Sequence, residues 1–189
     1  AMPAANVGGY WTSPFGNIID MWNVRYLGGD GPAPLGVSDA GWMVGASGAL
    51  PFLYYAPTLS SFLNTLTTGP TREGGANGIN PNGSRIAGYS RSSSGALRPV
   101  MWPGTSASVF TQDPIDLAAP MNDSQRSGVA LAVSSSGYVV GQVDSDYQGQ
   151  FRSRGFRTRV NASGSTVQIE QAKDVLPPSN QSGSLITYA

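Results

Sequence analysis

One stretch decides the fold: GINPNGSRIAGYS, residues 78–90. Two further stretches share its order of small residue, aliphatic residue, Ser or Asn, turn residues, Gly and a second Gly. They are GVSDAGWMVGAS, residues 36–47, and AVSSSGYVVGQ, residues 132–142. The copies start at residues 36, 78 and 132, so they are 42 and 54 residues apart. Spacings of this size are typical of repeat folds, and we expect the chain to repeat one structural unit.

The unit predicted by each copy is a β-hairpin. Ser38-Asp39-Ala40-Gly41 and Asn80-Pro81-Asn82-Gly83 have the residue types that close tight turns, with glycine available for a positive φ. Trp42-Met43-Val44 and Tyr138-Val139-Val140 have the aromatic and β-branched content of strands.

Two more strands are predicted after each hairpin. The third strands are expected at Pro51–Tyr55, Pro99–Gly104 and Gly155–Val160, and the fourth at Phe62–Leu66, Ile115–Leu117 and Lys173–Leu176. Four short strands in about 48 residues match the blade-type repeats of β-propellers.

The ends of the chain predict how the repeats close. Gly9–Pro14 and Ile18–Met21 fit a third and a fourth strand, and Ser184–Ala189 fits a first strand. The predicted fold is therefore a single all-β, propeller-like domain of about four short-stranded blades with terminal-strand closure. Its parts are a half repeat 1–35, repeats 36–77, 78–131 and 132–183, and a closing strand 184–189. Closure within one chain predicts a monomer, and the alternative is a fragment of a larger ring.

The composition excludes several chemistries. The chain has no His and no Cys, which excludes disulfides, thiol catalysis, Ser-His-Asp triads and histidine metal sites. Eleven basic and eleven acidic residues balance, so we expect no nucleic-acid partner. No apolar run approaches the roughly 20 residues of a membrane span. No cofactor is expected. The Gly-, Ser- and Asn-rich surface favours an extracellular or cell-surface location, with a signal peptide upstream of Ala1.

The repeats resemble the HAF repeat, a bacterial extracellular repeat. Tyr26–Gly29, Gly36–Ser47, Gly78–Ser90, Pro99–Trp102, Ile115–Leu117 and Ala132–Gly141 carry the resemblance. The histidine that gives the repeat its name is absent, and the third copy has Ala132-Val133-Ser134 in place of Gly-Ile-Asn. The resemblance implies a secreted or surface-exposed bacterial protein, such as an autotransporter passenger, an adhesin or a cell-wall module. It implies no catalytic residues.

Aromatic residues outside the repeat pattern are candidate stacking platforms for sugars. Trp11 and Trp102 fall at the same predicted repeat position, which favours a core role. Trp22 and Trp42 have no equivalent in the other copies and are the candidates for an exposed surface. Tyr147 lies beside a predicted loop and is a further candidate.

The charged candidates lie in the third repeat. Arg152, Arg154, Arg157 and Arg159 form the main charge cluster, with a bulge or a bend expected at Gly155. Guanidinium forks suit carboxylates and sulfates, although the same arginines also discourage aggregation at a sheet edge. Asp144 and Asp146 lie in a D-x-D motif and are a candidate calcium site. They lack the glutamate of an EF-hand loop, because the twelfth position is Gly155.

The sequence favours a non-enzymatic surface module that binds glycans or a protein partner, or that acts as a passenger or spacer. The alternative is a carboxylate-dependent glycosidase or lyase on a propeller scaffold, which needs two carboxylates in one cleft. Asp20, Asp116 and Asp174 recur at one repeat position and are expected to be structural, so no catalytic pair stands out among the acids.

Overall fold

The computed structural model describes residues 10–12, 18–20, 32–55, 59–104, 113–117, 127–147, 150–163, 166–169 and 173–174. These residues form an all-β structure whose only helical element is a single 3₁₀ turn, η2 (Gly69–Thr71). Within these ranges no helix has the length and apolarity needed to cross a membrane.

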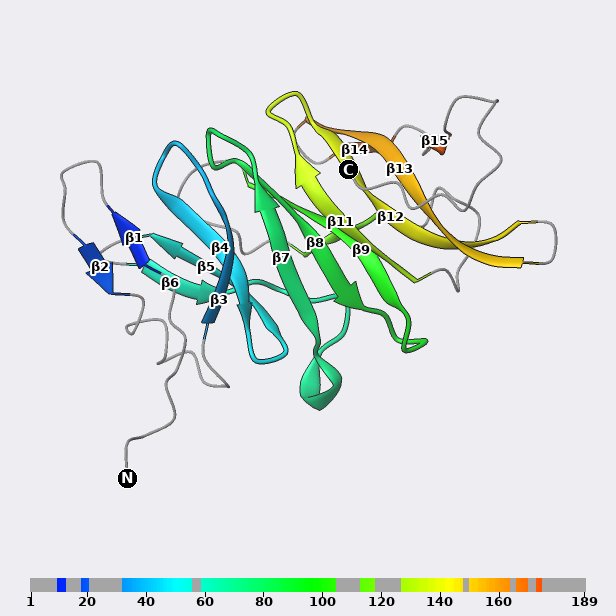
Figure 1. Cartoon of the computed structure of the whole chain (residues 1–189), viewed down its shortest axis with the longest axis horizontal. Coiled ribbons are helices and arrows are strands. Elements are labelled where there is room, and N and C mark those ends of the chain that lie inside the picture. Colours follow the sequence, from blue (N-terminus) through cyan, green and yellow to red (C-terminus); the bar gives the residue numbers. More distant parts are fainter. Residues whose placement is uncertain are drawn as a thin grey trace.

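The strands form three successive antiparallel sheets, which lie side by side in Figure 1. Sheet 1 contains β3 (Pro32–Val37), β4 (Trp42–Ser47), β5 (Leu50–Tyr55) and β6 (Leu59–Phe62). Sheet 2 contains β7 (Gly74–Ile79), β8 (Arg85–Arg91), β9 (Leu97–Pro103) and β10 (Ile115–Asp116). Sheet 3 contains β11 (Gly128–Val133), β12 (Tyr138–Tyr147), β13 (Gln150–Ser163), β14 (Thr166–Ile169) and β15 (Lys173–Asp174). A separate hairpin pairs β1 (Tyr10–Thr12) with β2 (Ile18–Asp20).

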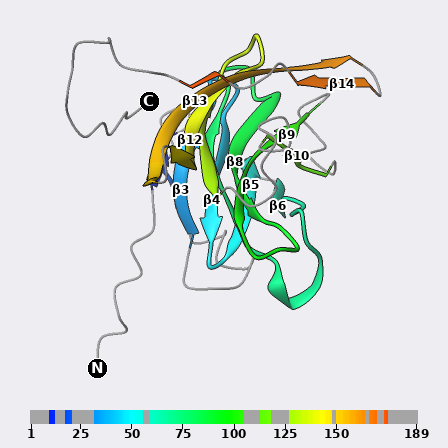
Figure 2. The same ribbon diagram turned by 90° about the vertical axis from the view of Figure 1, so that its right-hand side faces the viewer.

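The three sheets pack face to face. The first strand of sheet 2 lies against sheet 1, and the first strand of sheet 3 lies against sheet 2. Strand β7 contacts β3, β4 and β5, and β11 contacts β7, β8 and β9. The view turned by 90° in Figure 2 shows the sheets overlapping along this direction. Two hydrophobic cores fill the interfaces, and the first contains Trp42, Val44, Leu53, Leu63, Ala76, Ile86, Val100 and Trp102. The second contains Ala87, Met101, Leu117, Ala130, Val133, Val139, Val143, Phe156 and Val160.

Sheet 2 is buried on both of its faces because alternate residues of its strands enter different cores. Ile86 and Trp102 are opposite each other in the β8–β9 ladder and belong to the first core. Ala87 and Met101, the neighbouring pair, belong to the second core. This explains the nearly continuous apolar sequence of β9, since side chains of a strand alternate between the two faces of its sheet.

The predicted hairpin turns are confirmed, and one Ser or Asn side chain closes each of them. The first N–H of the second strand donates to this side chain in all three sheets: Trp42 to Ser38 Oγ at 3.0 Å, Arg85 to Asn80 Oδ1 at 2.9 Å, and Tyr138 to Ser134 Oγ at 3.0 Å. The second turn is one residue longer, and the longer Asn side chain spans it. Gly41, Gly83 and Gly137 occupy the positive-φ position of the three turns.

The first strands share a β-bulge and approach one another closely. The register shifts after Pro34 in β3, after Ala76 in β7 and after Ala130 in β11. A Cβ atom at Gly36 would lie 3.1 Å from Gly78 Cα, and one at Gly78 would lie 2.6 Å from Leu131 O. The next equivalent residue is Ala132, which is exposed. Alanine is tolerated there because its side chain faces open space.

A second set of glycines lies in the middle of the second strands, where no side chain fits. A Cβ atom would lie 2.0 Å from Ala33 O at Gly45, 2.0 Å from Gly75 O at Gly88 and 2.2 Å from Val129 O at Gly141. An aromatic ring from the third strand also lies over each glycine: Phe52, Trp102 and Phe156, respectively. Phe52 and Phe156 lie directly opposite their glycines, whereas Val100 lies opposite Gly88 and Trp102 is two residues farther along β9. In each sheet the glycine and an aromatic ring of the third strand form one packing unit.

Most of the predicted strands are confirmed with changes of detail, but the fourth strand expected at Phe62–Leu66 is wrong. The fourth strand of sheet 1 is β6 (Leu59–Phe62), and residues 63–66 lie outside the strands. The first strands begin at Pro32, Gly74 and Gly128, four residues before the starts assigned to the three repeats. In register, Asp20 pairs with Tyr10, Asp116 with Val100 and Asp174 with Phe156. This alignment makes Trp11 equivalent to Met101. The sequence had instead indicated that Trp11 is equivalent to Trp102.

No closed ring is seen among the described residues, whose sheets form an open row (Figure 1). The predicted closing strand, residues 184–189, lies outside the described residues.

Candidate functional site

The candidate site is the face of sheet 3 that points away from sheet 2, here called the outer face. Val139, Val143 and Phe156 of β12 and β13 point into the second core. The residues that alternate with them form the outer face: Tyr138, Val140, Gln142 and Asp144 on β12, and Ser153, Arg157 and Arg159 on β13. A largely polar surface that includes the aromatic residue Tyr138 is therefore exposed at the end of the row of described sheets.

Tyr138 is the centre of this surface. Its residue is 38% exposed, and it lies directly opposite Arg159 in the β12–β13 ladder. The Cζ atom of Arg159 lies 5.2 Å from the centroid of the Tyr138 ring, and that of Arg157 lies 5.6 Å from it. Both distances are within the range of cation–π attraction, so the ring orients two guanidinium groups at the surface.

A third guanidinium lies beside the same hairpin turn. Arg85, at the start of β8, donates through Nη1 to the carbonyl of Ser135. Arg159 donates through Nε to the carbonyl of Ser136 at 3.4 Å. Arg85 and Arg159 therefore bind carbonyls of the turn that leads into Tyr138, and Arg157 lies over the Tyr138 ring.

The positions of sheets 1 and 2 that correspond to Val140 and Arg157 of sheet 3 are buried against the next sheet. Val44 pairs with Leu53 in sheet 1, and Ala87 pairs with Met101 in sheet 2. Leu53 is 2% exposed and Met101 is 0% exposed. The corresponding pair in sheet 3 is Val140 with Arg157, and Arg157 is exposed. A sheet packed on this face would bury a guanidinium, at a cost of several kcal/mol unless a carboxylate met it.

Tyr138 itself departs from the pattern of its equivalents. The Trp42 ring lies against Gly83, in the turn of sheet 2, and the Arg85 guanidinium lies against Gly137, in the turn of sheet 3. Both side chains therefore contact the next sheet of the row. Tyr138 is instead flanked by arginines of its own sheet, and its exposed part is available to a ligand.

The other end of the outer face is a hydrogen-bonded chain. Gln142 Nε2 donates to Ser153 Oγ, and Ser153 Oγ donates to Asp144 Oδ1 at 2.9 Å. Asp144 and Asp146, the candidate calcium site, lie in strand β12, opposite Ser153 and Phe151. Among the described residues there is no cluster of three acidic side chains that could hold a metal ion. An extended strand also lacks the curvature of a calcium loop.

The four arginines of the predicted cluster occupy two different sets of alternate positions on β13. Arg157 and Arg159 belong to one set, and Arg152 and Arg154 belong to the other. The β12–β13 register runs without a shift from Tyr138 opposite Arg159 to Tyr147 opposite Gln150, so the bulge expected at Gly155 is absent. Arg154 pairs with Val143 and Arg152 with Ser145. The side chains of Arg152, Arg154 and Tyr147 lie outside the described part of the structure.

The expected exposure of Trp42 is wrong. Trp42 is 3% exposed, stacks on Tyr55 with ring centroids 4.5 Å apart, and belongs to the first core. It is buried because the first residue of β4 faces sheet 2. Trp102, expected in the core, is fully buried and donates through Nε1 to Asn64 O at 2.7 Å. Trp22 lies outside the described residues.

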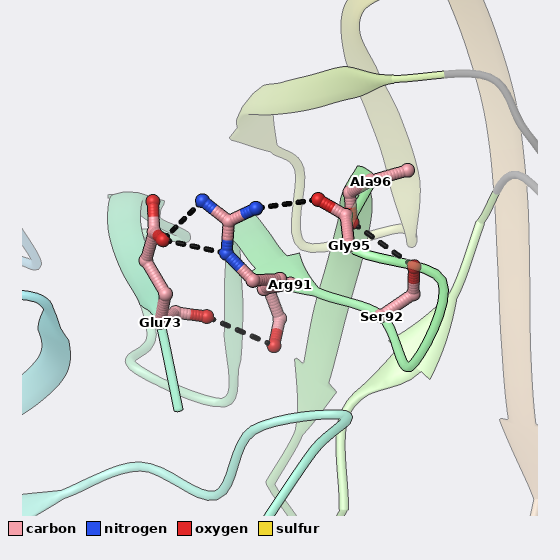
Figure 3. Close-up of polar contacts among 6 residues, drawn as sticks. Glu73, Arg91, Ser92, Gly95 and Ala96 are labelled. Carbon is pink, nitrogen blue, oxygen red and sulfur yellow. Dashed lines mark hydrogen bonds and ion pairs between the residues drawn. The ribbon is translucent and has the colours of Figure 1, made fainter. Parts of the chain in front are cut away.

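Figure 3 shows the ion pair of Glu73 and Arg91 at the edge of sheet 2. Arg91 Nε donates to Glu73 Oε2 at 2.6 Å, and its Nη1 donates to the carbonyl of Gly95 in the β8–β9 turn. Glu73 also faces Tyr89, whose pKa is raised by burial and then by this carboxylate. Burial alone raises the pKa of Tyr54.

Asp116 and Asp113 also have structural partners. Asp116 pairs with the buried Arg98, at 3.1 Å between Oδ2 and Nε, which supports the structural role expected for it. Asp113 Oδ1 accepts from Asn64 Nδ2 at 3.2 Å. Together with Glu73 and Asp144, these acids are held by cations, amides or hydroxyls. Their contacts provide no observation in favour of paired carboxylate catalysis.

Sequence reasoning missed Tyr138 and Arg85. Tyr138 had been taken only as a strand residue. The signal that could have found it is a comparison of the copies, because Arg157 replaces a large apolar residue where the other copies have Leu53 and Met101.

No protein-family model, curated protein or solved structure matches the chain.

Proposed function

We propose that the protein is a non-enzymatic, surface-exposed repeat module that binds a glycan through the outer face of sheet 3. One observation carries the proposal: Arg157 is exposed where Leu53 and Met101 are buried in the other two sheets, and the Tyr138 ring beside it is exposed as well. A stack of repeats that ends in a polar face is soluble at that end, and the same face is free to bind a ligand.

The chemistry of the outer face suits a saccharide. An aromatic ring offers an apolar platform to the C–H groups of a sugar, and planar guanidinium groups donate several hydrogen bonds in fixed directions. Gln142 and Ser153 extend the polar surface along the same strands. A sheet surface that extends along two strands favours a chain of sugar units over a small molecule that needs a deep pocket.

The repeat architecture supports the surface-exposed part of the proposal. The three sheets share the hairpin turn, the first-strand bulge and the glycine–aromatic unit, which is consistent with blades of a propeller-like fold of the HAF type. In this proposal the row stays open at the outer face of sheet 3. The absence of cysteine and the high content of Gly, Ser and Asn fit an extracellular or cell-surface location.

The test is binding of the full chain to a panel of polysaccharides, measured by isothermal titration calorimetry. Tyr138→Ala should abolish binding, whereas Tyr138→Phe should retain it because the ring is kept. Tyr55→Ala is the matched control, since Tyr55 is also 38% exposed but lies in sheet 1. Failure of every polysaccharide to bind, or equal losses from Tyr138→Ala and Tyr55→Ala, would overturn the proposal.

A further inference from the structure

We infer that the ligand of the outer face is an anionic saccharide whose carboxylate or sulfate is held by Arg157 and Arg159 beside the Tyr138 ring. This inference rests on the glycan-binding function proposed above and adds the chemical class of the ligand.

The first argument is the arrangement of charge. Arg157 and Arg159 lie over one ring, and Arg85 lies at the turn that precedes it. An anion bound beside the Tyr138 ring would be attracted by each of these guanidinium groups. Among the described side chains of the outer face, the acidic group of Asp144 lies toward the opposite end and accepts from Ser153. Guanidinium groups are therefore gathered at the Tyr138 end of the face.

The second argument is the type of cation. The guanidinium is a planar fork that matches the two oxygens of a carboxylate or sulfate, whereas an ammonium acts as a point charge. The Tyr138 ring holds both forks by cation–π attraction, which reduces the side-chain entropy lost on binding. Tyr138 is thus a positioning residue for the arginines as well as a surface for the sugar.

The third argument is the contrast with the two described ion pairs. In sheet 2, Arg91 meets Glu73 and Arg98 meets Asp116, so both arginines have a structural carboxylate. Arg157 occupies the position of Leu53 and Met101, where a charge contributes nothing to the packing of sheets. A cation at such a position is explained if it binds an anion from outside the chain.

The experiment compares three probes by calorimetry in 150 mM salt: oligogalacturonide, which carries carboxylates, dextran sulfate, which carries sulfates, and neutral dextran. We expect at least one polyanion to bind and neutral dextran not to bind. Arg157→Gln and Arg159→Gln should each weaken the affinity about tenfold, because each removes a charge-assisted hydrogen bond. Binding of only one polyanion supports the inference and identifies the group as carboxylate or sulfate.

Two variants separate this site from a general effect of charge. Arg91→Gln removes the same charge from sheet 2 and should leave the affinity unchanged. Arg157→Lys keeps the charge and loses the fork, so its affinity should lie between those of the parent protein and Arg157→Gln. Equal weakening by Arg91→Gln and Arg157→Gln would overturn the inference.

The outcomes also distinguish this inference from the proposed function. Binding of a neutral polysaccharide that depends on Tyr138 and is insensitive to Arg157→Gln overturns the anionic ligand and leaves glycan binding in place. Absence of binding to both polyanions overturns the inference, and the wider polysaccharide panel then decides the proposed function by itself.

Discussion

Replacing Gly88 by alanine should destabilise the protein by about 2.5 kcal/mol, although it adds only one methyl group. The new Cβ atom would lie 2.0 Å from Gly75 O and 2.9 Å from Trp102 Cζ3, and real Cβ contacts are essentially never below 3.0 Å. Strands β7 and β8 must therefore separate by about 1 Å in the middle of sheet 2. Overpacking of this kind costs about 3 kcal/mol, and alanine recovers about 0.5 kcal/mol by restricting the unfolded chain.

The assay is urea denaturation followed by tryptophan fluorescence, with the melting temperature as a second measurement. A loss of about 2.5 kcal/mol corresponds to a decrease of about 5–10 °C in a chain of this length. Gly95→Ala is the control, because Gly95 has φ +86° and nothing within 4 Å of the added Cβ atom. Its cost should be about 1 kcal/mol, from backbone strain alone. If Gly88→Ala costs no more than Gly95→Ala, the close approach of β7 and β8 is wrong.

Three further predictions test the packing, the ion pairs and the tyrosines. Leu53→Arg should lower the free energy of unfolding, measured by urea denaturation, by about 4 kcal/mol because it buries a guanidinium between sheets 1 and 2. Arg157→Leu should change it by about 0.5 kcal/mol or less. Equal effects of the two variants would contradict the assignment of the outer face. Asp116→Asn should lower the free energy of unfolding by about 3 kcal/mol because its partner Arg98 is buried. Glu73→Gln should lower it by only about 0.5 kcal/mol because both partners of that pair are partly exposed. A lower urea midpoint for Glu73→Gln than for Asp116→Asn would refute this prediction. The free energy of unfolding should decrease as the pH rises above about 10, because burial in the folded state raises the pKa of Tyr54 while the unfolded chain ionises its tyrosines at their ordinary pKa of 10.0. Tyr54→Phe should make the free energy of unfolding depend less steeply on pH between pH 9 and 11. An unchanged pH dependence would argue against burial of that hydroxyl.

The hairpin turns and most strands could be predicted because their signals are local. Ser38, Asn80 and Ser134 close turns with backbone groups four or five residues away, and a glycine with positive φ completes each turn. Such contacts lie within one stretch of sequence, so a repeated pattern reveals them.

The exposure of single aromatic residues could not be predicted, because it depends on contacts between sheets. Trp42 and Tyr138 occupy the same position in their hairpins, yet one is buried against Gly83 of the next sheet and the other is exposed. Uniqueness within the repeat was taken as a sign of exposure for Trp42. In fact, the neighbouring sheet decides exposure, and the sequence of one hairpin contains no information about it.

The candidate site was predicted in part. Arg157 and Arg159 were chosen because of their charge, and both lie on the outer face. Their association with Tyr138 depends on the register of β12 with β13, which a bulge at Gly155 would have changed. The absence of that bulge, and not the composition of the cluster, places these two arginines beside the ring.

The burial of sheet 2 on both faces has a consequence for how the protein opens. Each sheet contacts its neighbours in the row, so the described sheets behave as a one-dimensional array with nearest-neighbour coupling. Strands β8 and β9 can exchange their amide hydrogens only when both cores are disrupted, whereas sheet 3 can detach by losing the second core alone. Amide protection should therefore be higher in sheet 2 than in sheet 3, so that the outer face belongs to a unit that can unfold while sheet 2 stays intact.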